Sequence, residues 1–246
     1  MNQTDTRLRV ISYNIHGGVG TDGIHSYERI GRWLAERGAD IALLQEFDTR
    51  SQQRDTVADI QALCSNRFQQ LLPSPTVTTT HGWYGNAILT RYPVQEVHTI
   101  DTSQRGLEPR NIQQATLQTP SGTLQVINTH NGLQRIERKV QIGLLSDHIA
   151  GLDIHMGLPL VVAGDFNEWQ LFSRAFSTLN QLLTPHATGK TFPTGCPVFR
   201  LDRAWSSPAD IVQAARVVKT PETRRYSDHY PIELELTLAA ASARSR

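Results

Sequence analysis

Polar side chains that could bind a cation or move a proton occur where predicted strands end. The clearest case is PLVVAGDFNEW, in which the apolar run 160–163 is followed by Asp165 and Asn167. Such a run is typical of a buried strand. A strand that ends in a carboxylate and an amide either enters an ordinary turn or presents polar ligands at the edge of a sheet.

The same pattern recurs along the chain. Polar residues adjoin strand-like segments at Asn14, Glu46, His130, Asp165, Asn167, Asp202, Asp228 and His229. Each of them alone is more often a turn residue, a cap or a hydrogen-bonded structural residue. Glu46 is more informative, because a carboxylate directly after IALLQ is expected to be partly buried and to need a partner. Together they would gather carboxylates, amides and two imidazoles at one rim.

This set of side chains favours one kind of chemistry. Carboxylate and amide oxygens, completed by water, suit Mg²⁺ or Mn²⁺ better than zinc. The sequence has no HExxH, no cysteine pairs, no P-loop and no GxSxG, which argues against zinc, nucleotide-triphosphate and serine-hydrolase sites. An imidazole beside such a cluster can exchange a proton with water or contact a phosphate oxygen. The set therefore predicts metal-assisted attack of water on a phosphoester.

The segments that would position these residues are mostly strands. Strand-like patterns occur in RLRVISYNI, ADIALLQEF, YGNAILTRYPV, the hairpin ATLQTPSGTLQVINTH, PLVVAGD, IVQAARVVK and PIELELTL. Helices are predicted between Ser26, a candidate N-cap, and Gly38, over about 55–68, over 135–152, and near 170–183. In the third of these, apolar residues recur at roughly the helical period, at Ile136, Val140, Leu144 and Ile149. Strands outnumber helices, so we expect two packed sheets with helices outside, a layered α/β sandwich.

Length and composition limit the classes of protein. The 246 residues fit a single domain, with an ordered core over about 7–238 and a flexible tail at 239–246. The net charge of +1 argues against binding nucleic acid by bulk charge alone. No stretch approaches the ~20 apolar residues of a transmembrane helix. No secretion signal is evident, and two cysteines make no disulfide framework, so we expect a cytoplasmic protein without an obligatory protein partner.

Seven short motifs occur in a characteristic order between residue 12 and about residue 236. They are SYNIHGG, ALLQEFD, GNAILTRYPV, INTHNG, VVAGDFNEW, RLDRAW and YSDHYPIELEL. Each is weak alone, but GDFN and SDHYP with the upstream QE are specific. In these motifs the chain resembles the endonuclease/exonuclease/phosphatase superfamily of metal-dependent phosphohydrolases, as a compact bacterial-type member. The resemblance implies a four-layer α/β/β/α sandwich of two mixed sheets with helices on the outer faces, and Mg²⁺ or Mn²⁺ as cofactor.

The resemblance also implies a role for each matched residue near the metal and the water. Glu46 matches the main metal ligand, with Asn14 beside it in the metal shell and Asp228 as a second carboxylate near the metal. Asp165 matches the residue that orients or deprotonates the attacking water, and Asn167 an amide that contacts phosphate. If the backbone is extended here, Asp165 and Asn167 project on one side and Phe166 packs on the other.

The remaining roles concern the histidines and the phosphate. His229 matches the histidine that contacts the scissile phosphate, and His130 a second histidine of the nuclease and sphingomyelinase branches. Asp228 and His229 are adjacent, so on an extended strand they face opposite ways, and His229 needs another carboxylate. Asp202 is the candidate, which is also the role that the resemblance implies. Arg110 is a weaker match to a phosphate-contacting arginine.

The substrate is less well defined than the chemistry. The presence of both histidines resembles the diesterase branches and favours a phosphodiesterase, possible substrates being DNA or RNA. Alternatives on the same fold are a phospholipid head-group phosphodiesterase and a small-molecule phosphomonoesterase. A non-catalytic scaffold is a remote alternative, because a scaffold would lack Glu46, Asp165 or His229, and this sequence has all three.

Overall fold

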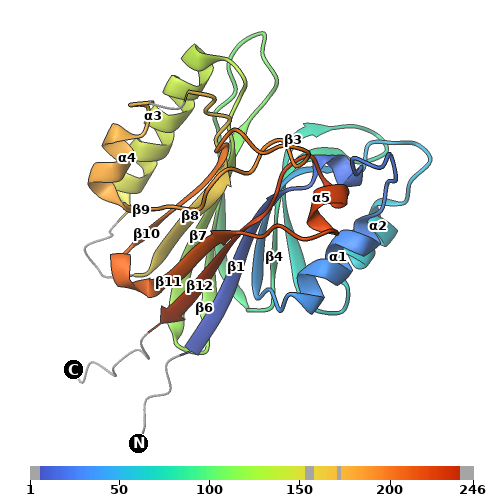
Figure 1. Cartoon of the computed structure of the whole chain (residues 1–246), viewed down its shortest axis with the longest axis horizontal. Helices are drawn as coiled ribbons and strands as arrows, with labels where there is room; N and C mark the ends of the chain where they lie inside the picture. The colour runs from blue at the N-terminus through green and yellow to red at the C-terminus, as the bar shows by residue number, and fades with distance from the viewer. Residues whose placement is uncertain (1–5, 153–157, 171–172, 239–246) are drawn as a thin grey trace, which may run out of the picture.

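Two six-stranded sheets form the centre of the molecule (Figure 1). The computed structural model describes residues 6–152, 158–170 and 173–238, so the predicted tail lies outside the described residues. In the first sheet the strands run in the order β11 (Val212–Val217), β12 (Ile232–Leu238), β1 (Thr6–Asn14), β2 (Ile41–Asp48), β4 (Trp83–Thr90) and β3 (Gln70–Thr78). In the second the order is β5 (Val94–Asp101), β6 (Asn111–Thr119), β7 (Gly122–His130), β8 (Leu160–Asp165), β10 (Asp202–Ser207) and β9 (Thr184–His186).

Helices cover the outer faces of both sheets (Figure 1). The first sheet is covered by α1 (Tyr27–Glu36) and α2 (Thr56–Cys64), and the second by α3 (Arg135–Gly151) and α4 (Ser177–Leu182). A short helix, α5 (Thr223–Tyr226), precedes β12, and the 3₁₀ turns η1 (His16–Gly18) and η3 (Ala209–Ile211) lie in loops. Both sheets are mixed, because β1 runs parallel to β2 and β7 parallel to β8 among antiparallel neighbours. The predicted four-layer α/β/β/α sandwich is confirmed.

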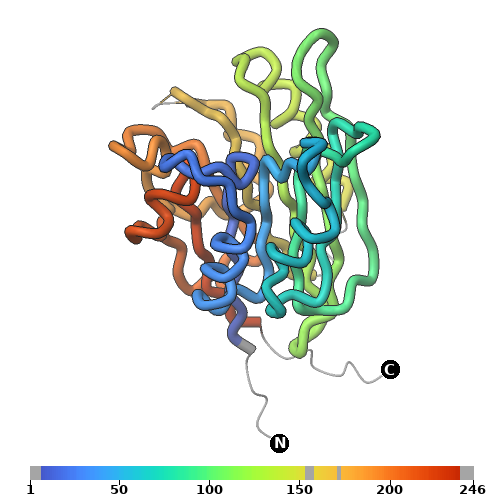
Figure 2. The backbone as a smooth tube through the Cα atoms, turned by 90° about the vertical axis from the view of Figure 1, so that its right-hand side faces the viewer, coloured from blue at the N-terminus to red at the C-terminus, as the bar shows by residue number. Residues whose placement is uncertain are grey.

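The alternation of side chains along the strands makes three apolar layers. Residues such as Val10, Leu43 and Val161 pack between the sheets, and their neighbours in sequence pack under the helices. The start of β1 and the end of β12 pair with each other at one end of the sandwich. The loops that follow β1, β7 and β8 lie at the opposite end (Figures 1 and 2).

Helix α1 follows the sequence pattern closely. The Ser26 hydroxyl accepts a hydrogen bond from the backbone N–H of Arg29 at 3.2 Å, as an N-cap does. Ile30 and Leu34 are fully buried against the first sheet. Gly38 follows the helix with a φ of 74°, a conformation that glycine adopts without strain.

The structure departs from the sequence pattern in its edge strands and in one helix. Strands β3, β5 and β9 were not predicted, and all three lie at sheet edges, where Pro73 and Pro75 of β3 are tolerated. Helix α3 is present as predicted, but Ile136 and Val140 are exposed. No helix of the described part of the chain is long and apolar enough to span a membrane.

Candidate active site

The predicted site residues lie at one end of the layer between the two sheets. In β8, Val161 and Ala163 pack in this layer, so Asp165, two residues further on, points into the same layer. The same alternation directs the side chains of Asn14 in β1, His130 in β7 and Asp202 in β10. All four are buried, which makes this end of the core polar.

Strand pairing sets three of these residues in one row. His130 of β7 is the parallel partner of Asp165, and Asp202 of β10 is the antiparallel partner of the same residue. Neighbouring strands are ~4.8 Å apart, so side chains in one row can interact directly. The regular register of the second sheet therefore accounts for the positions of His130, Asp165 and Asp202.

A β-bulge in β2 determines the position of Glu46. In β2, Leu43 packs between the sheets and Leu44 under α1, whereas Phe47 also packs under the helices. One extra residue therefore interrupts the alternation, and the pairing of β2 with β4 shifts between Leu44 and Phe47. Glu46 has a φ of 60°, in the left-handed region, which is typical of a β-bulge. The bulge leaves the Glu46 side chain at the rim, with 24% of it exposed.

A buried amide pair supports the bulge from the opposite sheet. Asn128 of β7 donates to the backbone oxygens of Leu44 at 2.9 Å and Ala87 at 3.2 Å. Its Oδ1 accepts from Nε2 of Gln45 at 2.7 Å. Both amides are fully buried. These bonds satisfy carbonyl groups on both strands that flank the irregular pairing.

Asn14 joins the two sheets at the centre of the site. Its Nδ2 donates to Oε1 of Glu46 at 2.8 Å and to Oδ2 of Asp165 at 3.0 Å. Its Oδ1 accepts from the backbone N–H of His16. Burial raises the pKa of both Glu46 and Asp165, because loss of water disfavours a charged carboxylate, and the charges of Asp228 and Asp202 respectively act in the same direction. A cation at this position would relieve that cost.

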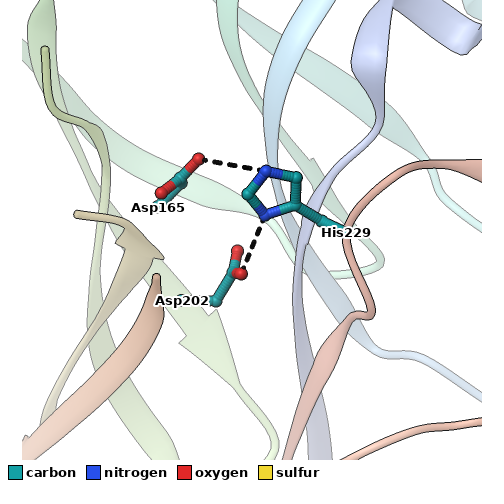
Figure 3. A group of neighbouring side chains, drawn as sticks. All are labelled: Asp165, Asp202 and His229. Atoms are coloured by element: carbon teal, nitrogen blue, oxygen red, sulfur yellow. Dashed lines mark hydrogen bonds and ion pairs between the residues drawn. The ribbon is translucent and has the colours of Figure 1, made fainter. Parts of the chain in front are cut away.

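His229 and Asp202 form a buried pair beside Asp165 (Figure 3). Nδ1 of His229 lies 2.9 Å from Oδ2 of Asp202, and its Nε2 lies 3.7 Å from Oδ2 of Asp165. Burial alone would lower the pKa of His229, but the charges of Asp202 and Asp165 raise it. Potential ligand atoms of all three residues lie within 4.8 Å of one another. Since Asp202 is hydrogen-bonded to the imidazole, we interpret this group as a proton-handling unit.

His130 faces the same carboxylates from the other side. Its Nε2 lies 3.6 Å from Oδ2 of Asp165 and 3.8 Å from Oε1 of Glu46. Burial lowers its pKa, and the positive charges of Arg110 and His229 act in the same direction. Both effects favour the neutral form of His130, whereas the carboxylates around His229 favour its charged form.

The GDFN segment forms a turn and also contains two of the predicted site residues, Asp165 and Asn167. Asn167 has a φ of 49°, so the expectation of an extended backbone with Asp165 and Asn167 on one side is wrong. Instead Oδ1 of Asp165 accepts from the backbone N–H of Asn167 at 2.9 Å, which closes an Asx turn. Nδ2 of Asn167 donates to the Asn131 carbonyl. Phe166 is fully buried against Phe176 and Trp205, as expected.

Asp228 and His229 lie in the loop before β12, and Ser227 fixes that loop. The Ser227 hydroxyl donates to the backbone oxygen of Asn14 at 2.7 Å and accepts from the backbone N–H of His229 at 3.1 Å. The loop at Thr194 adds a backbone hydrogen bond to the Asp228 carbonyl. The negative charge of Asp228 acts on both Glu46 and His229.

Arg110 lies at the edge of the site. It is buried, and its Nη2 donates to Oε2 of Glu108 at 2.6 Å. Burial alone would lower its pKa, but the negative charge of Glu108 raises it, which keeps the guanidinium charged. A cleft of about 940 Å³ runs from Glu46 past Tyr84 to Arg50 and Arg54. Phosphate contact by Arg110 stays a prediction.

The structure brings the predicted residues into one place, although their individual roles stay predictions. Sequence reasoning missed three supporting residues, Gln45, Asn128 and Ser227. All three lie within the quoted motifs: Gln45 in ALLQEFD, Asn128 in INTHNG and Ser227 in YSDHYPIELEL. Their neighbours in these motifs, Glu46, His130 and Asp228, were the ones to which roles were assigned.

Comparison with known proteins agrees with this geometry. The model of the Endonuclease/Exonuclease/phosphatase family matches residues 11–229. The chain belongs to this family, whose members hydrolyse phosphoester bonds. The uncharacterized protein YbhP of Escherichia coli strain K12 is 31% identical over 166 residues. That match spans 64% of each protein, so the chain covers under two thirds of the length of this relative.

Two solved structures show how widely the fold is shared. Mannosyl-6-phosphatase Bt3783 of Bacteroides thetaiotaomicron VPI-5482 has a TM-score of 0.74 and 18% identity, covering 93% of this chain and 99% of that one. D. rerio TDP2 complexed with a single-strand DNA product has a TM-score of 0.70 and 18% identity, with coverages of 94% and 99%. At this identity the likeness establishes the fold alone.

Proposed function

We propose that the chain is a phosphodiesterase that depends on Mg²⁺ or Mn²⁺. One observation carries the proposal. A single carboxylate oxygen, Oδ2 of Asp165, is held by Asn14 and faced by Nε2 of both His130 and His229 at 3.6 and 3.7 Å. A carboxylate between two imidazoles is suited to take a proton from water beside a phosphate.

The residues around Glu46 fit a divalent cation. Glu46 and Asp228 supply hard carboxylate oxygens, and Asn14 holds Glu46 by a hydrogen bond of 2.8 Å. We assign Glu46 as the main ligand, with Asp228 and Asn14 in the metal shell. When bound, the cation would stabilise negative charge on the phosphoryl and leaving oxygens.

The chain's own groups would handle the proton and the phosphate. Asp165 accepts the proton of the attacking water, and its orientation is fixed because Asn14 holds one of its oxygens and the Asn167 backbone holds the other. His229 donates from Nε2 to a phosphate oxygen, since Asp202 holds Nδ1–H and favours the charged imidazole. Asn167 and Arg110 are assigned to phosphate contact.

The two imidazoles that face Asp165 support a diester over a monoester, because the presence of both His130 and His229 resembles the diesterase branches of the family. The choice among a nucleic acid, a phospholipid head group and a small diester is left to experiment. A cytoplasmic location stays a prediction.

Hydrolysis of two chromogenic esters tests the proposal. We expect cleavage of bis-p-nitrophenyl phosphate in preference to p-nitrophenyl phosphate, only with Mg²⁺ or Mn²⁺, and a loss of about 10²–10⁴-fold in His229→Ala. His98→Ala is the matched control, because His98 is exposed on the edge strand β5. Cleavage of the monoester alone would replace this proposal by a phosphatase, and full activity in chelator would contradict the metal requirement.

A further inference from the structure

An apolar stripe runs along the exposed face of α3. Large apolar side chains are exposed at Leu133 (62%), Ile136 (80%), Val140 (40%) and Leu144 (37%). Their spacing of three or four residues places them on one side of the helix and of the turn before it. Isolated exposed apolar residues are ordinary, but a contiguous apolar surface marks an interaction site.

The stripe is not a loosely packed core face, because α3 is already anchored by its opposite side. Ile142, Leu145 and Ile149 are buried against the second sheet. Arg138, also on the buried side, pairs with buried Glu168 at 3.6 Å. The helix therefore has a complete inner face, and the stripe contributes nothing to it.

Cations accompany the stripe. Arg135 and Lys139 are exposed beside Ile136 and Val140. Arg174 lines the same groove as Ile136 and Lys139. Of the two acids in α3, Glu137 is buried, and Asp147, three residues after Leu144, is exposed and lines the same groove. The first three turns thus present apolar and positively charged side chains together.

The stripe begins next to the active site. Leu133 is three residues after His130, at the end of the sandwich where β7 and β8 end (Figure 1). The intervening turn is rigidly held, because the Gly132 N–H donates to Oε1 of Gln141 at 2.8 Å and Arg138 donates to the Leu133 carbonyl. A partner that binds Leu133 and Ile136 would therefore be held close to the active site.

We propose that the stripe Leu133–Leu144 docks the protein on the surface of an anionic phospholipid bilayer. Apolar side chains bury in the membrane interface, and neighbouring basic side chains add attraction to anionic lipids. The exposed cations Arg135 and Lys139 would meet like charges across a symmetric interface with a second copy of the chain, which makes that copy the weaker occupant. The proposal goes beyond the phosphodiesterase function and does not require a lipid substrate.

Cosedimentation of the full chain with vesicles tests this docking without any turnover. We expect binding to phosphatidylcholine vesicles that contain about one third phosphatidylglycerol, and much weaker binding to phosphatidylcholine alone. The double variant Leu133→Ser/Ile136→Ser should lower the partition coefficient about tenfold. Arg135→Gln/Lys139→Gln should lower it several-fold and reduce its dependence on salt.

A matched control and a second readout make the outcomes decisive. Val57→Ser removes an apolar side chain with a similar exposure, 61%, from α2 on the other outer layer, and should bind as the wild type does. Equal weak binding of the wild type to both vesicles, or equal loss in Val57→Ser, would overturn the proposal. So would a dimer in sedimentation velocity that the double serine variant abolishes, because the stripe would then belong to a second copy. Hydrolysis of the soluble diester by the double variant should be unchanged, which separates this proposal from the proposed function.

Discussion

The two sheets contribute to the site in different ways. From the second sheet, His130, Asp165 and Asp202 come from three neighbouring strands in regular register. From the first sheet, Glu46 depends on a β-bulge, and His229 depends on a loop. Regular pairing places the first group without further support, whereas the second group needs Asn128 and Ser227 to fix it. We therefore expect substitutions in the first group to lower activity with little effect on stability. Substitutions of Asn128 or Ser227 should also lower stability.

The largest expected effect is that of Asp165→Asn. Loss of the proton acceptor should lower kcat for the diester about 10²–10⁴-fold. The melting temperature should change little, because relief of the unfavourable buried charge offsets the loss of one of the two hydrogen bonds that Asp165 accepts. Asp210→Asn, at an exposed carboxylate, is the control. Intact activity in Asp165→Asn would mean that GDFN is only a turn.

Glu46→Gln tests the half of the site that depends on the bulge. Removing the main metal ligand should raise the Mg²⁺ concentration for half-maximal rate at least ~10-fold. The measurement is a metal titration of diester hydrolysis, with Glu28→Gln on the exposed face of α1 as control. An unchanged titration would remove Glu46 from the metal site.

Asp202→Asn should have an intermediate effect, because Asp202 acts through His229. We expect a loss of about 10–100-fold in kcat. The Asp202 charge raises the pKa of His229, so the neutral amide should lower it. If charged His229 is the active form, activity is lost as the pH rises through this pKa, and the variant should lose activity at a lower pH. A pH–rate profile identical to that of the wild type would contradict this role.

Asn128→Ala should have the smallest effect on activity and a clear effect on stability. It leaves the Leu44 and Ala87 carbonyls without their side-chain partner, which should lower the free energy of unfolding by about 1–3 kcal/mol. The metal titration should shift in the same direction as in Glu46→Gln, but less. An unchanged free energy of unfolding in denaturant would show that the β-bulge is stable without Asn128.

The residues that the second sheet contributes could be predicted from sequence, because they lie on regular strands. Apolar runs that end in His130 and Asp165 reveal both the strand and the face, because the side-chain period of a strand is two. Asp202 was assigned to His229 on the expectation that Asp228 and His229 lie on an extended strand. That expectation is wrong, because both residues lie in a loop, but the observed distance of 2.9 Å agrees with the pairing. The individual catalytic roles stay predictions.

The irregular features could not be predicted from the same signals. A left-handed φ at Glu46 has no local signature, because glutamate seldom adopts it, and Asn167 has only a weak one, because asparagine adopts it more often than most residues. The exposure of the apolar stripe of α3 could not be predicted either. The inner face of this helix is partly polar, with Arg138 and Gln141 buried by long-range partners, so apolar periodicity alone did not identify it.

A double-mutant cycle tests most directly whether the two halves form one catalytic site. The rates of diester hydrolysis would be measured at saturating Mn²⁺ for the wild type, Glu46→Gln, Asp165→Asn and the double variant. Groups that act as a unit show strongly non-additive effects, and Asn14 joins these two carboxylates directly. We expect the double variant to be about as slow as the slower single variant. Losses that simply multiply would contradict a single site built from both sheets.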